Sequence, residues 1–308
     1  MKGNHKKLNL SKKGYLNFKP FYKKYNMKKI VKLILPMFMV GLIIYSCTKE
    51  NEINDIQTID YEKIGKEHNL GLDFIFNELK NKKISIDSKG NNFENLMIET
   101  KKSSTSFVEY SELTSNLNSK NIINIFNEYD KLAVKDIKYR RKGTKSNSNP
   151  IIEMKDQVEL TAFQIKFFDQ LDNVISNLDL DLGLDLTIEK INEIEKNILL
   201  ECPKGEQFLL LSSTSIAKNS LTYWNNNLEK WLNLLNEDPK NKTFSKTVTF
   251  SKNDWGWFSD TLKSMGKSDV VGGVIGLCVA GPPGAVAGAC YSSAGRGVVA
   301  LFDAWGLW

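Results

Sequence analysis

The chain has 308 residues, of which 25% are charged and 41% hydrophobic, and these proportions are ordinary for a globular protein. Its formal net charge of +6 suggests nucleic-acid binding only until the charges are located, because eleven of the 42 basic residues fall within the first 32 positions. The chain from Cys47 onward carries 31 basic against 36 acidic residues. This mildly acidic balance does not suggest a surface that binds the phosphates of a nucleic acid.

The first segments of the chain predict export and not a fold. Residues 1–26 are a basic extension, or they precede a true start at Met27, and we exclude them from the folded part. Residues 27–46 form a signal peptide in which two lysines precede the apolar run Leu33–Tyr45. Those 13 residues are too few for a membrane span, which needs about 20, and they match the core of a signal peptide.

The residues Ile44, Ser46 and Cys47 at the end of this run resemble the lipobox of bacterial lipoproteins. The resemblance implies that Cys47 is acylated, with palmitate for example, and becomes the mature N-terminus in the cell envelope. The acid-leaning tether, residues 47–58, is similar to that of Bacteroidetes lipoproteins and implies the outer membrane. The alternative is an uncleaved signal anchor that keeps Leu33–Tyr45.

Apolar residues at helical spacing predict a mainly α fold, a helical bundle, for the mature chain. The N-terminal helical region, residues 59–139, contains predicted helices from Tyr61 and from Asn121. Between them, Ser103–Asn118 is rich in serine, threonine and asparagine, and we expect it to form a loop.

A second helical region follows a polar segment. Residues 140–150 end at a proline that disfavours helix before it, so we expect a linker there. The main helical region then covers residues 151–250. Its apolar periodicity predicts three helices: Met154–Leu178, one from Thr187 to just before Pro203, and Gly205–Asn236.

The single histidine of the mature chain, His68, limits the catalytic chemistry available. A Ser-His-Asp or Cys-His site would have to use it as the base, and the cysteines do not form a CxxC zinc motif. His68 lies on the apolar stripe of the first helix, where a hydrogen-bonded core residue is the commoner role. We therefore predict no catalytic residue, no metal site, no cofactor and no enzymatic activity.

Two further segments resemble the same group of Bacteroidetes lipoproteins, GKEHNLGLDFI near the start of the mature chain and IAKNSLTYWNNNLEKW later. No activity is assigned to that group, so the resemblance implies none. The matching positions are Gly65, His68, Asn69, Gly71, Leu72, Asp73, Ser220, Tyr223 and Trp224.

The run LDLDLGLDL, residues 178–186, has the spaced aspartates of a calcium loop. An EF-hand requires glycine at position 6 and glutamate at position 12, and here Gly183 and Glu189 each miss their position by one. The interleaved leucines predict a structural connector with one buried face.

The C-terminal region, residues 251–308, contains 26 residues without charge, Val270–Gly295, between clusters of tryptophan. Pro282 and Pro283 interrupt it, which predicts two helices, Asp269–Ala280 and Gly284–Leu301, folded back as a hairpin. Small residues at every fourth position predict a seam of close packing, in the membrane or between helices. They are Gly272, Gly276, Ala280, Gly284, Gly288 and Ser292.

These features predict an exported cell-envelope lipoprotein, attached to the membrane by its lipid, that binds no nucleic acid and serves as a non-enzymatic surface or periplasmic interaction protein whose protein partner is unknown. The alternative is a membrane-active protein, because the glycine-rich end resembles the zippers of bacteriocin-like and pore-forming proteins. In an exported protein, Cys278 and Cys290 can also form a disulfide across the hairpin.

Overall fold

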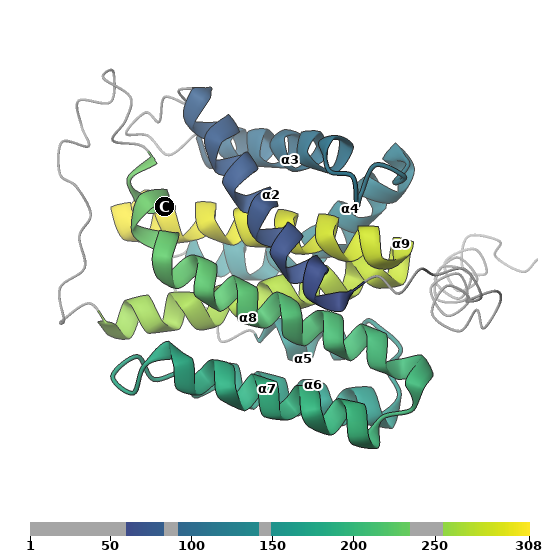
Figure 1. Ribbon diagram of the computed structural model, residues 1–308. Helices are drawn as coiled ribbons and strands as arrows, with labels where there is room; N and C mark the ends of the chain where they lie inside the picture. Colours follow the sequence, from purple (N-terminus) through teal and green to yellow (C-terminus); the bar gives the residue numbers. More distant parts are fainter. Residues whose placement is uncertain (1–59, 83–91, 142–148, 235–254) are drawn as a thin grey trace, which may run out of the picture. The chain divides into compact units, whose positions relative to one another are not determined.

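A computed structural model describes residues 60–82, 92–141, 149–234 and 255–308, and these residues are mainly helical, with no strand among them (Figure 1). The predicted mainly α bundle with a glycine-rich C-terminal hairpin is confirmed. The predicted signal peptide, Cys47 and the tether lie outside the described residues. The helices are α2 (Tyr61–Asn81), α3 (Asn92–Tyr110), α4 (Ser119–Arg140), α5 (Pro150–Lys155), α6 (Ala162–Ser176), α7 (Leu184–Glu201), α8 (Lys204–Leu232) and α9 (Trp255–Trp305).

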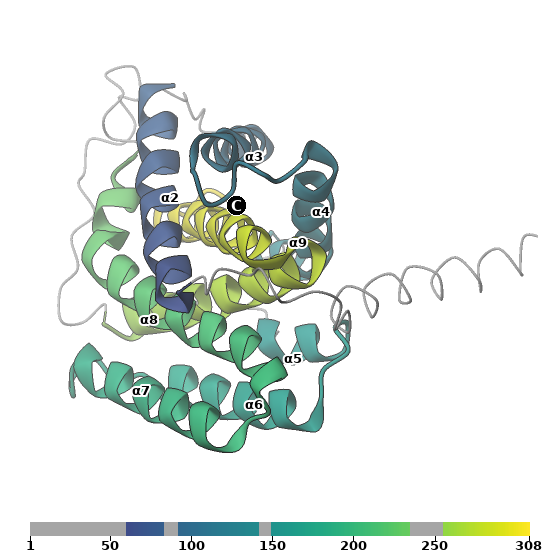
Figure 2. The same ribbon diagram turned by 45° about the vertical axis from the view of Figure 1, so that its right-hand side comes forward.

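Helix α9 is the centre of the bundle. From Val270 to Gly295 it has no charged residue, and most of its side chains between Leu262 and Phe302 are buried. A helix that is apolar on all sides must be enclosed, and α2, α3, α4, α5, α6 and α8 all pack against it (Figures 1 and 2). The outer helix α7 packs on α6 and α8 instead.

The chain reverses direction inside α9. Ala280 and Gly281 have non-helical backbone angles, and Gly281 has φ of 68°, a left-handed conformation that costs glycine little. The adjacent prolines then open the second arm, where a missing amide is tolerated. Residues 255–279 and 282–305 thus form a hairpin. Its first arm begins at Trp255, earlier than predicted, because its polar first turns bury Leu262 and Met265.

The predicted row of small residues faces inward, between the two arms. A Cβ atom added at Gly276 would overlap the carbonyl oxygen of Gly284, and one added at Gly272 would overlap that of Gly288. The two backbones therefore touch, as glycine allows. We call this contact line the glycine seam. Two residues that face each other across it have numbers that add up to 560, as Gly276 and Gly284 do, and this rule defines the register of the hairpin.

The predicted loop Ser103–Asn118 is wrong over its first half, because α3 continues to Tyr110. The hydroxyls of Thr100 and Ser104 each donate, at 2.8 Å, to the carbonyl oxygen four residues earlier, and both side chains are fully buried. Hydroxyls satisfied within the helix in this way can lie on its buried face. A composition rich in serine and threonine therefore did not indicate a loop here.

The predicted single helix Met154–Leu178 is also wrong, since α5 ends at Lys155 and α6 begins at Ala162. A capping box starts α6: the Thr161 hydroxyl accepts from the Gln164 amide, and the Gln164 side chain accepts from the Thr161 amide. These reciprocal hydrogen bonds satisfy two backbone amides that, in a continuous helix, would donate to carbonyl oxygens of the preceding turn. The predicted α7 and α8 occur within a few residues of their expected bounds.

Candidate functional site

A cleft of about 750 Å³ opens where the glycine seam ends. Position 296, opposite Ser264 in the hairpin register, holds arginine in place of a small residue, and its guanidinium donates across the gap to the Ser264 hydroxyl. The arms of α9 lie farther apart toward their outer ends than at the reversal (Figure 1), and α4 and α5 line the other side of the cleft. The change from small to large side chains along one helix face therefore creates the cavity.

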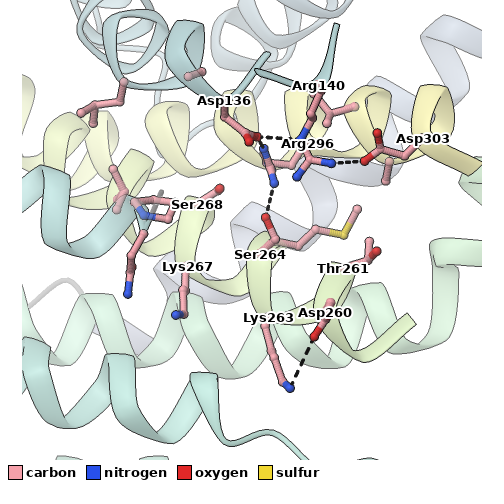
Figure 3. A pocket seen from close by; sticks show the side chains of 18 of the residues that line it. Asp136, Arg140, Asp260, Thr261, Lys263, Ser264, Lys267, Ser268, Arg296 and Asp303 are labelled. Carbon is pink, nitrogen blue, oxygen red and sulfur yellow. Dashed lines mark hydrogen bonds and ion pairs between the residues drawn. The ribbon is translucent and has the colours of Figure 1, made fainter. Parts of the chain in front are cut away.

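Four charged side chains form the inner wall of the cleft (Figure 3). Asp136 of α4 accepts a hydrogen bond from Arg140 Nε at 3.0 Å and another from Arg296 of the second arm. Arg140 also donates to Asp303. The side chains of this network are at most 23% exposed, and their charges cancel, as burial of ions requires.

Two groups of this wall, Asp136 and Arg296, keep their ionisation state near neutral pH. Burial alone would raise the pKa of Asp136, but the Arg296 and Arg140 guanidiniums outweigh it and hold the pKa below its ordinary value. Burial would lower the pKa of Arg296, yet Asp136 raises it above the usual range. Burial raises the pKa of Tyr129, which also lines the cleft, to about 12. The inner wall thus offers fixed charges and hydrogen bonds, with little capacity to exchange protons.

The outer wall is more accessible and less tightly paired. It contains Asp260, whose side chain is 69% exposed and lies 3.7 Å from Lys263 Nζ. Thr261 of the same arm also lies on this wall (Figure 3). Trp257 of the same arm and Glu153 of α5 line the cleft as well. A ligand entering the cleft would meet polar groups and an aromatic ring before it reached the ion network.

His68 does not line this cleft; the structure places it in the core, fully buried. Its Nε2 atom lies 3.3 Å from Asp269 Oδ2, the same oxygen that accepts hydrogen bonds from Ser220 and Ser293 at 2.6 Å. This buried cluster joins α2, α8 and both arms of the hairpin. A histidine enclosed in this way is not reachable by a substrate.

The predicted disulfide between Cys278 and Cys290 is excluded by the hairpin register. The position opposite Cys290 is 270, so the two cysteines are eight residues apart along the arms, or about 12 Å. A disulfide needs Cα atoms within about 7 Å. Both residues are buried and carry thiols, and Cys290 Sγ donates to the His68 carbonyl oxygen at 3.5 Å. Burial raises the pKa of the Cys290 thiol well above its usual value.

The aspartate-rich run, residues 178–186, forms a turn and the start of α7, but the predicted single buried face of its leucines is wrong, since Leu182 is 67% exposed. Asp179 accepts from the Asp181 amide at 2.9 Å in a local turn, and Leu178 is buried. Gly183, with φ of 91°, then begins α7. Within the described ranges, no group of three or more histidine, cysteine, aspartate or glutamate side chains could hold a metal ion.

The inner wall was not identified from the sequence, although two signals for it were present. Arg296 is the first charge after the uncharged stretch, and Asp136 and Arg140 stand one helical turn apart on α4. Neither signal identifies its partner, because Arg296 and Asp136 are 160 residues apart in the chain.

No known protein family, curated protein or solved structure matches this chain. Among the described helices, α9 is long and apolar enough to cross a membrane by length and composition, although 67% of its most apolar window is buried inside the domain. Function is therefore inferred from the chemistry of this chain's own residues.

Proposed function

We propose that this chain is an exported, lipid-anchored protein of the cell envelope whose helical domain is a non-enzymatic binding module, with the cleft between α4, α5 and α9 as its binding site. The proposal of export rests on the basic segment, the short apolar run Leu33–Tyr45 and Cys47. The proposal of binding rests on one observation, the ion network of the inner wall.

The network favours recognition over catalysis. Arg140 and Arg296 each present five N–H donors in a planar fork, and the bonds to Asp136, Asp303 and Ser264 leave further donors for a ligand. Because the pKa values of Asp136 and Arg296 move away from neutrality, neither group is suited to transfer protons near pH 7. The cavity lies in the size range of small-molecule sites, and it also admits a few side chains of a protein partner.

The anchor is tested by mass spectrometry of the N-terminal peptide after expression of the full chain in a bacterial host and separation of its membranes. We expect an acylated peptide that begins at Cys47, and release of the protein from the membrane fraction in the Cys47→Ser variant. An intact chain that retains Leu33–Tyr45 and carries no lipid would contradict the proposal.

The cleft is tested with a photo-reactive amino acid placed at Thr261, on the outer wall, in intact cells. The matched control carries the same amino acid at Thr222, an exposed threonine on α8 outside the cleft. We expect one discrete adduct from position 261 that is absent from position 222 and is reduced in the Arg140→Met variant. Equal labelling at the two positions, or none at 261, would count against the cleft.

A membrane-active role is the second candidate, and the form of the hairpin favours it. The uncharged stretch ends at Asp269 and Arg296, and each of these side chains contacts a residue from another helix, His68 and Asp136 respectively. Separation of these pairs would free an apolar hairpin whose tip, Leu277–Pro283, is already partly exposed except at Cys278.

Dye release from anionic liposomes by the full chain tests this second role. A substitution in the glycine seam is a poor probe, because it disrupts the fold itself. Val279→Asp at the hairpin tip places a charge where insertion would bury it, at about 3 kcal/mol, so release should fall strongly. Leu200→Asp, at a position that is 83% exposed, should leave release unchanged. Absence of release by the unmodified chain would exclude the role.

A further inference from the structure

Helices α3 and α4 lie on the second arm of α9, and two ion pairs join them across a gap. Lys101 of α3 lies 3.1 Å from Asp130 of α4, and Glu94 of α3 pairs with Arg141, the residue that follows α4. The two pairs are seven residues apart along α3, about 10 Å, and eleven residues apart along the other wall, about 16 Å. They lie at the two ends of the gap, on a different face of α4 from the cleft described above.

An apolar groove of about 710 Å³ lies between these ion pairs. Its walls are Met97 and Ile98 from α3, with Val134 and Ile137 from α4, and Tyr291 of α9 also lines it. Ile98 is 51% exposed and Val134 is 57% exposed, although large aliphatic side chains gain free energy when they leave water. The groove therefore offers apolar surface that the described part of the chain does not cover.

The charge at the rim is unequal. Lys101 and Arg141 are matched by Asp130 and Glu94, whereas Lys138 also lines the groove, is exposed, and has no ion pair within the described residues. Lys138 stands one helical turn beyond Val134 on the same face of α4. An apolar occupant with a single negative charge at one end would match both the walls and this lysine.

We propose that the groove binds the hydrocarbon chain of a free medium-chain fatty acid, with its carboxylate beside Lys138. The space between the ion pairs, about 10 Å along α3 and about 16 Å along α4, corresponds to the extended length of roughly eight to thirteen methylene groups. A hydrocarbon chain of this length fits between the two ion pairs without displacing either of them. This site is independent of the function proposed for the cleft.

The groove is tested by photo-labelling of the full chain with decanoic acid that carries a diazirine at its methyl end, followed by peptide mapping. We expect labelled peptides from α3 and α4, and about a tenfold loss of labelling when Ile98→Gln and Val134→Gln are combined. Ile123→Gln is the matched control, because Ile123 is also on α4 and is 53% exposed but does not line the groove.

The length of the chain and the charge of its head group are tested separately by competition. Among unlabelled fatty acids, each added methylene should improve competition about fourfold until the groove is filled, after which the gain should stop. Lys138→Glu should weaken competition by decanoate at least fivefold and leave competition by decanol unchanged. A gain that continues with every added methylene would indicate non-specific partition of the fatty acids and would overturn a groove of defined length.

Two other outcomes would also overturn the proposal. Labelling that is equal in the groove variants and in Ile123→Gln would show that the probe binds elsewhere. Self-association of the unmodified chain that is abolished by Ile98→Gln with Val134→Gln, but not by Ile123→Gln, would assign the groove to a second copy of the chain.

Discussion

At the scale of single residues, the surroundings of each glycine determine what a side chain costs there. In the hairpin, the backbone of the opposite arm lies where the Cβ of residue 276 would be, whereas nothing lies within 4 Å of a Cβ at Gly256 in the same helix. Glycine is necessary at position 276 because two backbones touch there. At position 256 glycine only adds conformational freedom to the unfolded chain.

We therefore expect Gly276→Ala to lower the free energy of unfolding by about 3 kcal/mol or more, because the backbone of Gly284 cannot give way. Gly256→Ala should leave stability unchanged or raise it by about 0.5–1 kcal/mol. Urea unfolding of the full chain, followed by circular dichroism, measures both. Similar effects of the two substitutions would contradict the close contact of the arms.

A second residue-scale prediction concerns Asp136. Its pKa in the folded state is below that of an unfolded aspartate, about 3.9, so its stabilising contribution is complete above that pH and is lost as the pH falls further. At pH 7, Asp136→Asn should cost about 3 kcal/mol, because the buried Arg296 loses its counter-charge.

The difference in stability between Asp136→Asn and the unmodified chain should shrink below about pH 4, because the Asp136 carboxylate then takes up a proton in the unfolded chain before it does so in the folded one. Asp260→Asn is the control, since that carboxylate is 69% exposed, and this change should have little effect at any pH. Chemical unfolding at pH 7 and pH 3 measures the difference. A constant difference between the two pH values would show that Asp136 is not held in the ion network.

At the scale of elements, the hairpin is set by two separate devices, the reversal at Gly281 and the glycine seam. Gly281 has a left-handed backbone and open space around its Cβ position, so a side chain there meets strain but no clash. Gly281 also has ψ of −159°, a region almost exclusive to glycine, so Gly281→Ala should cost about 1–3 kcal/mol, less than Gly276→Ala, where a side chain clashes with backbone. Urea unfolding measures the loss of unfolding free energy in both variants. A larger loss for Gly281→Ala than for Gly276→Ala would contradict the separate roles of the reversal and the glycine seam.

At the scale of the whole molecule, the helices before and after the predicted linker, residues 140–150, share one core. α2, α3 and α4 pack on α9, and so do α5, α6 and α8. Trp224 of α8, for example, donates to Ser293 of α9 at 2.8 Å, and Tyr291 of α9 stacks on Phe126 of α4 at 4.2 Å. Neither group of helices buries its apolar face without the hairpin.

We therefore expect the described helices to unfold in a single transition. Near- and far-ultraviolet circular dichroism should give the same midpoint in urea, and hydrogen exchange should report similar opening free energies for the buried amides of α2 and α8. Two resolved transitions, one for the helices before residue 140 and one for those after residue 150, would show that the segment separates two domains.

The sequence by itself determined the helical class, the approximate bounds of α2, α4, α7 and α8, and the reversal of the C-terminal hairpin. These features are local: apolar periodicity records which face of a helix is buried, and Pro282 with Pro283 prevents an unbroken helix. The sequence did not determine which residues of other helices pack against each buried face. A stretch rich in serine and threonine also concealed the end of α3, because its hydroxyls bond within their own helix.

Only the tertiary structure decided the rest. It joined His68 to Asp269 across 201 positions and Arg296 to Asp136 across 160, and it separated Cys278 from Cys290 although they share a hairpin. The physical reason is that the sequence shows where each charge or thiol stands in the chain. Its partner in space depends on how the helices pack and on the register of the two arms. The cleft lies where the row of small residues ends at Arg296. Its position follows from the residues that face Arg296 from the opposite arm, and the sequence does not identify them.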